Sequence, residues 1–181
     1  MGFGANGDVL MNDRTTKKVC NIKKNDILDK GAKVICIVKR FTNESTVISK
    51  NDLNISGFHP IFYHFEWHLP IWVCKLDKNK NIIYVDNECV YNFVLDSRHV
   101  ININGVTTCT LGHNYTYDDI VKHDFYGTEK VIDDLETFTS YKRGIVNLYD
   151  INIHRDSNDK ICRYRDSNFN SDYDDDSAYS S

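Results

Sequence analysis

The sequence lacks the features that mark membrane-spanning and secreted chains. No apolar run approaches the roughly 20 residues that a membrane helix requires. Residues 1–6 contain no basic segment followed by an apolar one, so no secretory signal is visible. Only 2 prolines occur, and no linker rich in Gly, Pro or Ser interrupts residues 1–155. We therefore expect a single domain that is intracellular, in the cytoplasm, and has no membrane partner.

An excess of basic charge is also missing. From Arg165 onward the chain carries five acidic residues and one basic residue, which leaves 21 of each sign in residues 1–164. Nucleic-acid binding depends on neutralising phosphates, so a neutral body without a basic stripe argues against a nucleic-acid partner. Residues 156–181 are expected to form an acidic, disordered tail rich in Ser and Asp.

Closely spaced cysteine pairs are absent. The 6 cysteines form no CxxC motif, so a structural zinc site made of four cysteines is not expected. Most of them fall within apolar runs, where a buried thiol behaves as a small hydrophobic residue. We expect reduced cysteines that belong to the core. Their positions are 20, 36, 74, 89, 109 and 162.

Short β-forming runs dominate what the sequence does contain. Hydrophobic residues make up 41% and aromatic residues 12%, as is typical of globular proteins. Runs rich in Val, Ile, Tyr and Thr, separated by polar turns, predict an all-β, mostly antiparallel fold. One helix is expected to begin near Thr128-Glu129, where apolar residues recur three to four apart. The predicted strands cover residues 9–11, 33–39, 46–49, 81–85, 89–95 and 99–108.

Three segments resemble one known family. Residues 2–28 contain a strand, a tight polar turn and a return strand, and resemble the N-terminal block of Hint domains. Hint domains are the fold shared by Hedgehog autoprocessing domains and inteins. Ser56-Gly57-Phe58-His59-Pro60 resembles the family's Thr-x-x-His-Pro block, with Ser56 in place of threonine. Residues 90–106 are similar to the family's C-terminal strand block.

Further segments resemble the Vint subclass of Hint domains, which is found beside von Willebrand A modules. Close relatives are bacterial-intein-like (BIL) domains embedded in ubiquitin precursors. The resemblance covers roughly residues 2–155. It implies a horseshoe-shaped Hint/intein-type β fold with a small C-terminal extension that contains helix. The segments are residues 92–95, 104–106, 110–113, 123–128 and 131–135.

The resemblance implies a self-processing activity. Hint domains convert the amide before their first residue into a thioester by an N-to-S acyl shift. By the match, His59 gives a proton to the departing nitrogen, and Ser56 helps to position the carbonyl. Histidine suits this task because its ordinary pKa lies near working pH. Asp96 and His99 match residues that assist later proton transfers.

The implied substrate is covalently attached to the domain. It would be a polypeptide fused upstream, such as a ubiquitin-like or von Willebrand A domain. The expected domain is a monomer that requires no cofactor.

The nucleophile is where the sequence departs from the family. The alignment places the catalytic Cys of Hint domains at Gly2, and a glycine cannot form a thioester. The chain as written is therefore expected not to perform the first step. Either the Cys was replaced deliberately, or the domain is naturally degenerate. The alternative function is a catalytically inactive Hint fold that acts as an interaction or zinc-binding module.

The pair His113-Asn114 has the form in which splicing Hint domains end. In those domains the Asn side-chain amide attacks its own backbone carbonyl. Here Tyr115 follows, so no Cys, Ser or Thr stands ready to accept an acyl group. We therefore interpret Asn114 as internal and expect N-terminal cleavage rather than full splicing.

Histidines are the candidate metal ligands. Imidazole and thiolate suit Zn²⁺, and Hint active sites gather such residues around one cleft. His59, His113 and His123 are therefore candidates for a zinc ion that inhibits or regulates the domain.

Overall fold

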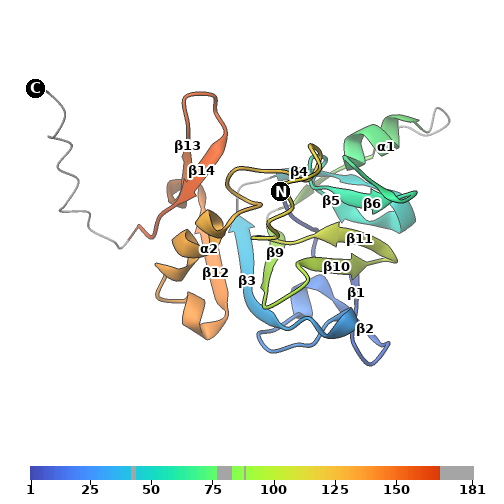
Figure 1. Ribbon diagram of the computed structural model, residues 1–181, viewed down its shortest axis with the longest axis horizontal. Coiled ribbons are helices and arrows are strands. Elements are labelled where there is room, and N and C mark those ends of the chain that lie inside the picture. The colour runs from blue at the N-terminus through green and yellow to red at the C-terminus, as the bar shows by residue number, and fades with distance from the viewer. Residues whose placement is uncertain (42–43, 77–82, 88, 168–181) are drawn as a thin grey trace, which may run out of the picture.

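The computed structural model describes residues 1–41, 44–76, 83–87 and 89–167. Of the expected acidic tail, residues 168–181 lie outside the described residues, and so do residues 81–82 of one expected strand. Strands dominate the fold and most of them pair antiparallel, which confirms the predicted class (Figure 1).

The strands and helices have the following bounds. The strands are β1 (Asp8–Leu10), β2 (Thr16–Lys18), β3 (Val34–Phe41), β4 (Glu44–Ile48), β5 (Asn54–Ile55), β6 (Ile61–Tyr63), β7 (Glu66–His68), β8 (Tyr84–Asn87), β9 (Val90–Leu95), β10 (Val100–Ile103), β11 (Val106–Cys109), β12 (Ile145–Tyr149), β13 (Ile153–Arg155) and β14 (Ile161–Tyr164). The α-helices are α1 (Pro70–Leu76) and α2 (Glu129–Glu136), and short 3₁₀ turns occupy Val19–Asn21, Asp29–Gly31, Lys50–Asp52, Tyr141–Arg143 and Asp150–Asn152.

The largest sheet joins the start of the chain to its middle, in the order β2-β1-β10-β11-β6-β7. The expected continuous strand at residues 99–108 is instead a hairpin, because Asn104 and Gly105 form a turn between β10 and β11. Both residues have positive φ, 53° and 75°, which is the conformation that an Asn-Gly hairpin turn requires. The turn is tied to β1, since Asn104 accepts a hydrogen bond from the backbone N–H of Asp8 at 2.7 Å.

A second sheet has the order β12-β3-β9. Its central strand β3 pairs antiparallel with β9 and parallel with β12. Along β3, Cys36, Val38 and Arg40 all point to the buried side, as the two-residue period of a strand requires. The parallel pairing with β12 was not predicted, because a parallel partner is reached through a long crossover that leaves no local signal.

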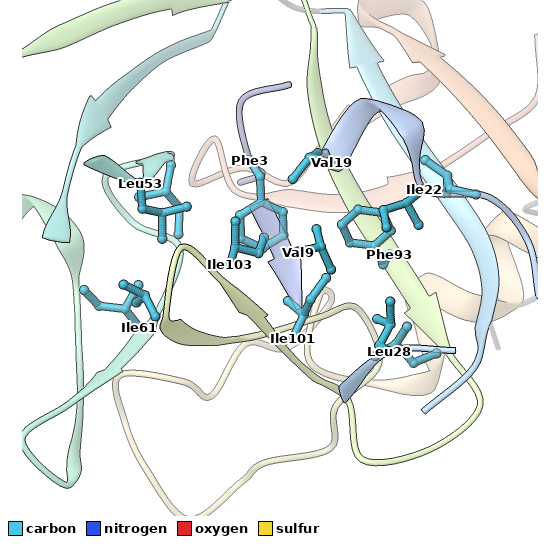
Figure 2. Packing of buried hydrophobic residues seen from close by; sticks show 14 of the residues in the cluster. Phe3, Val9, Val19, Ile22, Leu28, Leu53, Ile61, Phe93, Ile101 and Ile103 are labelled. Carbon is cyan, nitrogen blue, oxygen red and sulfur yellow. The ribbon is translucent and has the colours of Figure 1, made fainter. Parts of the chain in front are cut away.

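The core of the body surrounds Phe3. This side chain is fully buried, and its ring lies 6.1 Å from that of Phe93. Figure 2 shows it among Val9, Ile103 and Leu53, which come from three separate segments of the chain. Complete burial of a phenylalanine stabilises a fold by about 1.5–3 kcal/mol. The first residues are therefore fixed in the middle of the molecule, where Figure 1 marks the N-terminus.

A second core cluster lies around α2. The helix begins at Glu129, as predicted, and buries Val131 and Leu135 one turn apart. These side chains pack with Phe125, with β12 and with Tyr164 at the end of β14. No helix within the described ranges is long and apolar enough to cross a membrane.

The ordered domain extends past the expected boundary at residue 155. That boundary lies inside the β13–β14 hairpin, whose second strand is Ile161–Tyr164. Tyr164 is buried, its ring meets that of Phe125 edge-on at 5.0 Å, and its N–H donates to Asp134 at 2.7 Å. The polar composition of residues 156–160 conceals this strand, because those residues form the tip of the hairpin.

The cysteines only partly follow the expectation. All six lie in the described part of the chain, and none forms a disulfide. Only Cys36 and Cys109 are buried, whereas Cys20 and Cys162 are exposed. The prediction of burial was therefore correct for Cys36 and Cys109, which occupy inward-facing positions of central strands. It was not correct for the exposed Cys20 and Cys162.

Replacing Tyr164 with Ala tests whether the C-terminal hairpin is part of the domain. We expect Tyr164→Ala to lower the free energy of unfolding by about 2–4 kcal/mol, because it leaves a cavity beside Phe125. The control Cys162→Ala changes an exposed residue on the same strand and should cost less than about 0.5 kcal/mol. Urea denaturation followed by fluorescence measures both, and equal small effects would show that the hairpin is dispensable.

Candidate active site at the start of the chain

The loop between β5 and β6 holds two predicted site residues against the beginning of the chain. The N–H of His59 donates to the carbonyl of Ser56 at 3.0 Å, which closes a tight turn. Pro60 follows, and its carbonyl accepts a hydrogen bond from the hydroxyl of Thr108 at 2.7 Å. The turn from Ser56 to His59 is thus closed by its own hydrogen bond, and the residue after it is tied to β11.

Ser56 contacts Gly2 directly. Its backbone N–H and its hydroxyl both donate to the carbonyl of Gly2, at 2.9 and 3.2 Å. This carbonyl follows the Met1–Gly2 amide, so the serine fixes the residue after the amide rather than the amide's own carbonyl. On the other side, Phe3 exchanges two backbone hydrogen bonds with Tyr91, of 2.8 and 2.9 Å. Gly2 and Phe3 are therefore held between the end of β5 and β9.

His59 is buried with one ring nitrogen engaged. Its Nε2 lies 2.9 Å from the carbonyl oxygen of Cys109, and its ring centroid is 4.5 Å from that of Phe3. A carbonyl can only accept a hydrogen bond, so Nε2 carries the proton and Nδ1 carries the lone pair. Nδ1 is buried and has no hydrogen-bond partner among the described residues. The geometry therefore presents an unused base.

Burial sets the charge state of His59. Loss of solvent lowers its pKa to about 3, and the hydrogen bond to Cys109 offsets only part of that effect. The nearby N-terminus, His113 and Arg40 lower the pKa further. At neutral pH the ring is thus uncharged, so it can donate a proton to a departing nitrogen only after accepting one from elsewhere.

A cleft of about 560 Å³ opens beside Met1, between the Ser56–Phe58 turn and the β13–β14 hairpin. Arg40 and Arg155 contribute positive charge to its walls. Burial, then Arg40 and Arg155, hold the pKa of the Met1 amino group well below its usual range. An uncharged amide in the same place would carry no such penalty. The surroundings of Met1 therefore disfavour a charged amino group.

Arg40 is a functional candidate that the sequence reasoning missed. It is only 8% exposed, and its Nη1 donates to the hydroxyl of Tyr126 at 3.2 Å. Its place on β3, two residues after Val38, puts it on the buried side of the strand. The alternation of inward and outward side chains along β3 could have identified Arg40, since a cation at an inward position requires a specific partner or role.

His113 belongs to the same region. It lines a small cavity together with His59 and Met1, and burial lowers its pKa to about 4. Gly127 approaches its ring so closely that a Cβ there would lie 2.9 Å from Cε1. His99 is half-buried next to His113, and burial lowers its pKa as well.

Two other predicted residues, Asp96 and Asn114, make their hydrogen bonds outside this region. Asp96 is exposed, and its carboxylate accepts hydrogen bonds from the N–H of Lys33 and the hydroxyl of Ser97, both at 2.9 Å. These bonds lower its pKa. The exposed Asn114 donates through its side chain to Glu129 at 2.8 Å. Neither side chain lines the cleft or the small cavity.

The histidines offer poor geometry for zinc. Nδ1 of His113 accepts the N–H of Tyr115, and Nδ1 of His123 accepts the N–H groups of Phe125 and Tyr126. In the neutral ring the proton then sits on Nε2, which leaves no lone pair for a metal. Within the described part of the chain, no three His, Cys, Asp or Glu side chains are placed to hold a metal ion.

The fold and site define a class: a β domain that buries its own first residues beside a neutral histidine. Comparison with protein families agrees. The family model that matches is Vint, described as a Hint-domain, and the match covers residues 1–163. The chain therefore belongs to the Vint family of Hint domains, which are in general autoprocessing domains. A search of curated proteins gives no match.

The lowered pKa of His59 predicts that stability falls in acid. The unfolded chain protonates this ring near pH 6.5, whereas the folded chain keeps it neutral until about pH 3. The unfolded state therefore gains protons first as pH falls. We expect His59→Gln to remove about 2 kcal/mol of the stability difference between about pH 7 and about pH 5.

Chemical denaturation at the two pH values measures this difference. His154→Gln is the control, because His154 is exposed on β13. An unchanged pH dependence in His59→Gln would show that the ring takes up its proton at the same pH in the folded and unfolded chains.

Proposed function

We propose that the native activity of this domain is release of a polypeptide fused before it, through a thioester at position 2. The observation that carries the proposal is the neutral, buried His59, whose Nδ1 is unused beside the beginning of the chain. The upstream polypeptide, ubiquitin-like or carrying a von Willebrand A module, would pass through the cleft that Met1 lines. With Gly2 as written, the chain lacks the nucleophile and is inactive.

The reaction requires a cysteine at position 2. Its thiol gives a proton to Nδ1 of His59, and the sulfur attacks the carbonyl carbon of Met1. The carbon–nitrogen bond breaks, and the imidazolium returns its proton to the departing nitrogen of residue 2. The products are a thioester at Met1 and a free amine on residue 2. With a pKa of about 3, the His59 ring is a weak base toward the thiol, and its imidazolium, once formed, is a strong acid that delivers the proton readily to the departing nitrogen.

Ser56 and Phe3 position the reacting amide in this scheme. Ser56 holds the carbonyl of residue 2, and the pairing of Phe3 with Tyr91 holds the residue that follows. Holding a reacting group in place speeds the reaction, because the entropy cost of orienting it is met before the reaction begins. Full splicing is not part of the proposal, since the Asn114 side chain is bonded to Glu129.

Restoring the cysteine tests the proposal. A reporter protein is fused before Met1 in the Gly2→Cys variant, and release is followed on gels after addition of dithiothreitol. We expect release of the reporter, and His59→Gln in the same background should slow it by about 10²–10⁴-fold. His154→Gln serves as the matched control, because it removes an exposed histidine outside the site.

Space at position 2 sets a condition on that test. A Cβ at Gly2 would lie 2.8 Å from the carbonyl oxygen of Tyr91 and 2.9 Å from Cγ2 of Val90. Gly2→Cys is therefore paired with Gly2→Cys/Val90→Ala, which removes Cγ2 of residue 90 and leaves its Cβ, at 3.0 Å. An intact fusion in both folded variants, under thiol and with His59 present, contradicts the proposed function.

The same close contact favours a second candidate function. Strand β9 approaches Gly2 more closely than a side chain allows, as expected for a domain that has adapted to the glycine. Such a domain would be a Hint fold retained as an interaction module. The codon at position 2 in the genomic precursor distinguishes the two, because a native cysteine favours autoprocessing and a native glycine favours the module.

A further inference from the structure

A small cavity of about 40 Å³ lies between His59 and the beginning of the chain. Met1, Cys109, Thr110 and His113 also line it. Two of its lining residues carry a buried polar atom without a hydrogen-bond partner in the described part of the protein: Nδ1 of His59 and Oγ1 of Thr110. Their residues are 2% and 3% exposed.

Both atoms need a partner of complementary chemistry. A buried polar group without a hydrogen bond costs about 1–3 kcal/mol. Nδ1 of His59 can only accept, because Nε2 holds the proton toward Cys109. The Thr110 hydroxyl can donate or accept. A water molecule satisfies both requirements, and a polar cavity larger than about 10–15 Å³ can hold one.

We propose that this cavity binds one water molecule between His59 and Thr110, and that this water is the acyl acceptor that hydrolyses the Met1 thioester. The proposal rests on the proposed function above and identifies its acceptor. Thr110 is then a positioning residue, because it orients the water without touching the polypeptide that is released.

The hydrolytic step balances without any further reactant. The water oxygen attacks the carbonyl carbon of Met1, and its proton passes to Nδ1 of His59. The carbon–sulfur bond breaks, and the departing thiolate takes the proton from the imidazolium. The products are a carboxylic acid on Met1 and a free thiol on residue 2.

The size of the cavity argues for water over larger acceptors. A volume of about 40 Å³ is sufficient for water and suits it better than a thiol reagent or an amine-bearing molecule. Larger acceptors would have to approach through the neighbouring cleft of about 560 Å³, which Met1 also lines. Hydrolysis and thiol-induced release therefore use different approaches, and a change in the small cavity should separate them.

The test compares the two routes in the Gly2→Cys fusion, or in Gly2→Cys/Val90→Ala if only that variant cleaves. Thr110→Val keeps the shape of the side chain and removes the hydroxyl. We expect the ratio of spontaneous hydrolysis to dithiothreitol-induced release to fall about tenfold or more, as loss of one hydrogen bond implies. Thr110→Ser, which retains a hydroxyl, should restore the ratio, and Thr107→Val on β11, the strand that ends just before Thr110, should leave it unchanged.

Two further measurements do not depend on that ratio. Hydrolysis in ¹⁸O-water should place one heavy oxygen on the released Met1 carboxylate, as mass spectrometry detects. A high-resolution crystal structure of the chain as written should show the water beside Thr110, and that of Thr110→Val should not.

The outcomes separate the two proposals. Equal slowing of both routes in Thr110→Val, or slowing that Thr110→Ser does not reverse, overturns the role of Thr110. Absence of the water from the crystal structure does the same. Release by thiol with an unchanged ratio leaves the proposed function standing and overturns only the water. A fusion stable to both buffer and thiol overturns the proposed function and the acceptor together.

Discussion

Two backbone hydrogen bonds between Phe3 and Tyr91 anchor the start of the chain in the centre of the molecule. The buried ring of Phe3 adds to this anchor, because it packs against the rings of both Phe93 and His59. The next residue continues the attachment, since the N–H of Gly4 donates to Asn54 at 3.0 Å. The position of the Met1–Gly2 amide is a consequence of this pairing.

The same burial determines the chemistry of the site. Removing solvent from His59 keeps its ring neutral, and removing solvent from the Met1 amino group disfavours its charge. Arg40 strengthens both effects through its own positive charge. A peptide bond carries no net charge, so it suits this environment better than an ammonium group does. The site thus disfavours a charged amino group at Met1 and retains a neutral ring beside it.

Close packing around Gly2 leaves little room for a reactive side chain at that position. Without a Cβ, Gly2 lets β9 approach closely, which tightens the pairing of Phe3 with Tyr91. A cysteine at that position would need room that Val90 and the Tyr91 carbonyl now occupy. Packing around the first residues and formation of a thioester therefore compete for the same space.

Local signals in the sequence determined much of the fold. The β-branched runs predicted β3, β4 and β9, and the spacing of Val131 and Leu135 predicted α2. Short segments in the family's order identified the family, because each of them matches a turn or a strand of the Hint fold. Hairpins such as β10–β11 were only partly foreseen, since the turn at Asn104 lies within one continuous β-forming run.

The tertiary structure alone decided which residues share an environment. Segments far apart in the chain place Arg40 and Arg155 at one cleft, and His59 and Thr110 at one cavity. The parallel pairing of β12 with β3 and the burial of Tyr164 likewise depend on contacts between distant segments. Solvent exclusion, which sets the pKa of His59, belongs to the assembled fold. No residue type or spacing encodes it, because it arises only when those segments pack together.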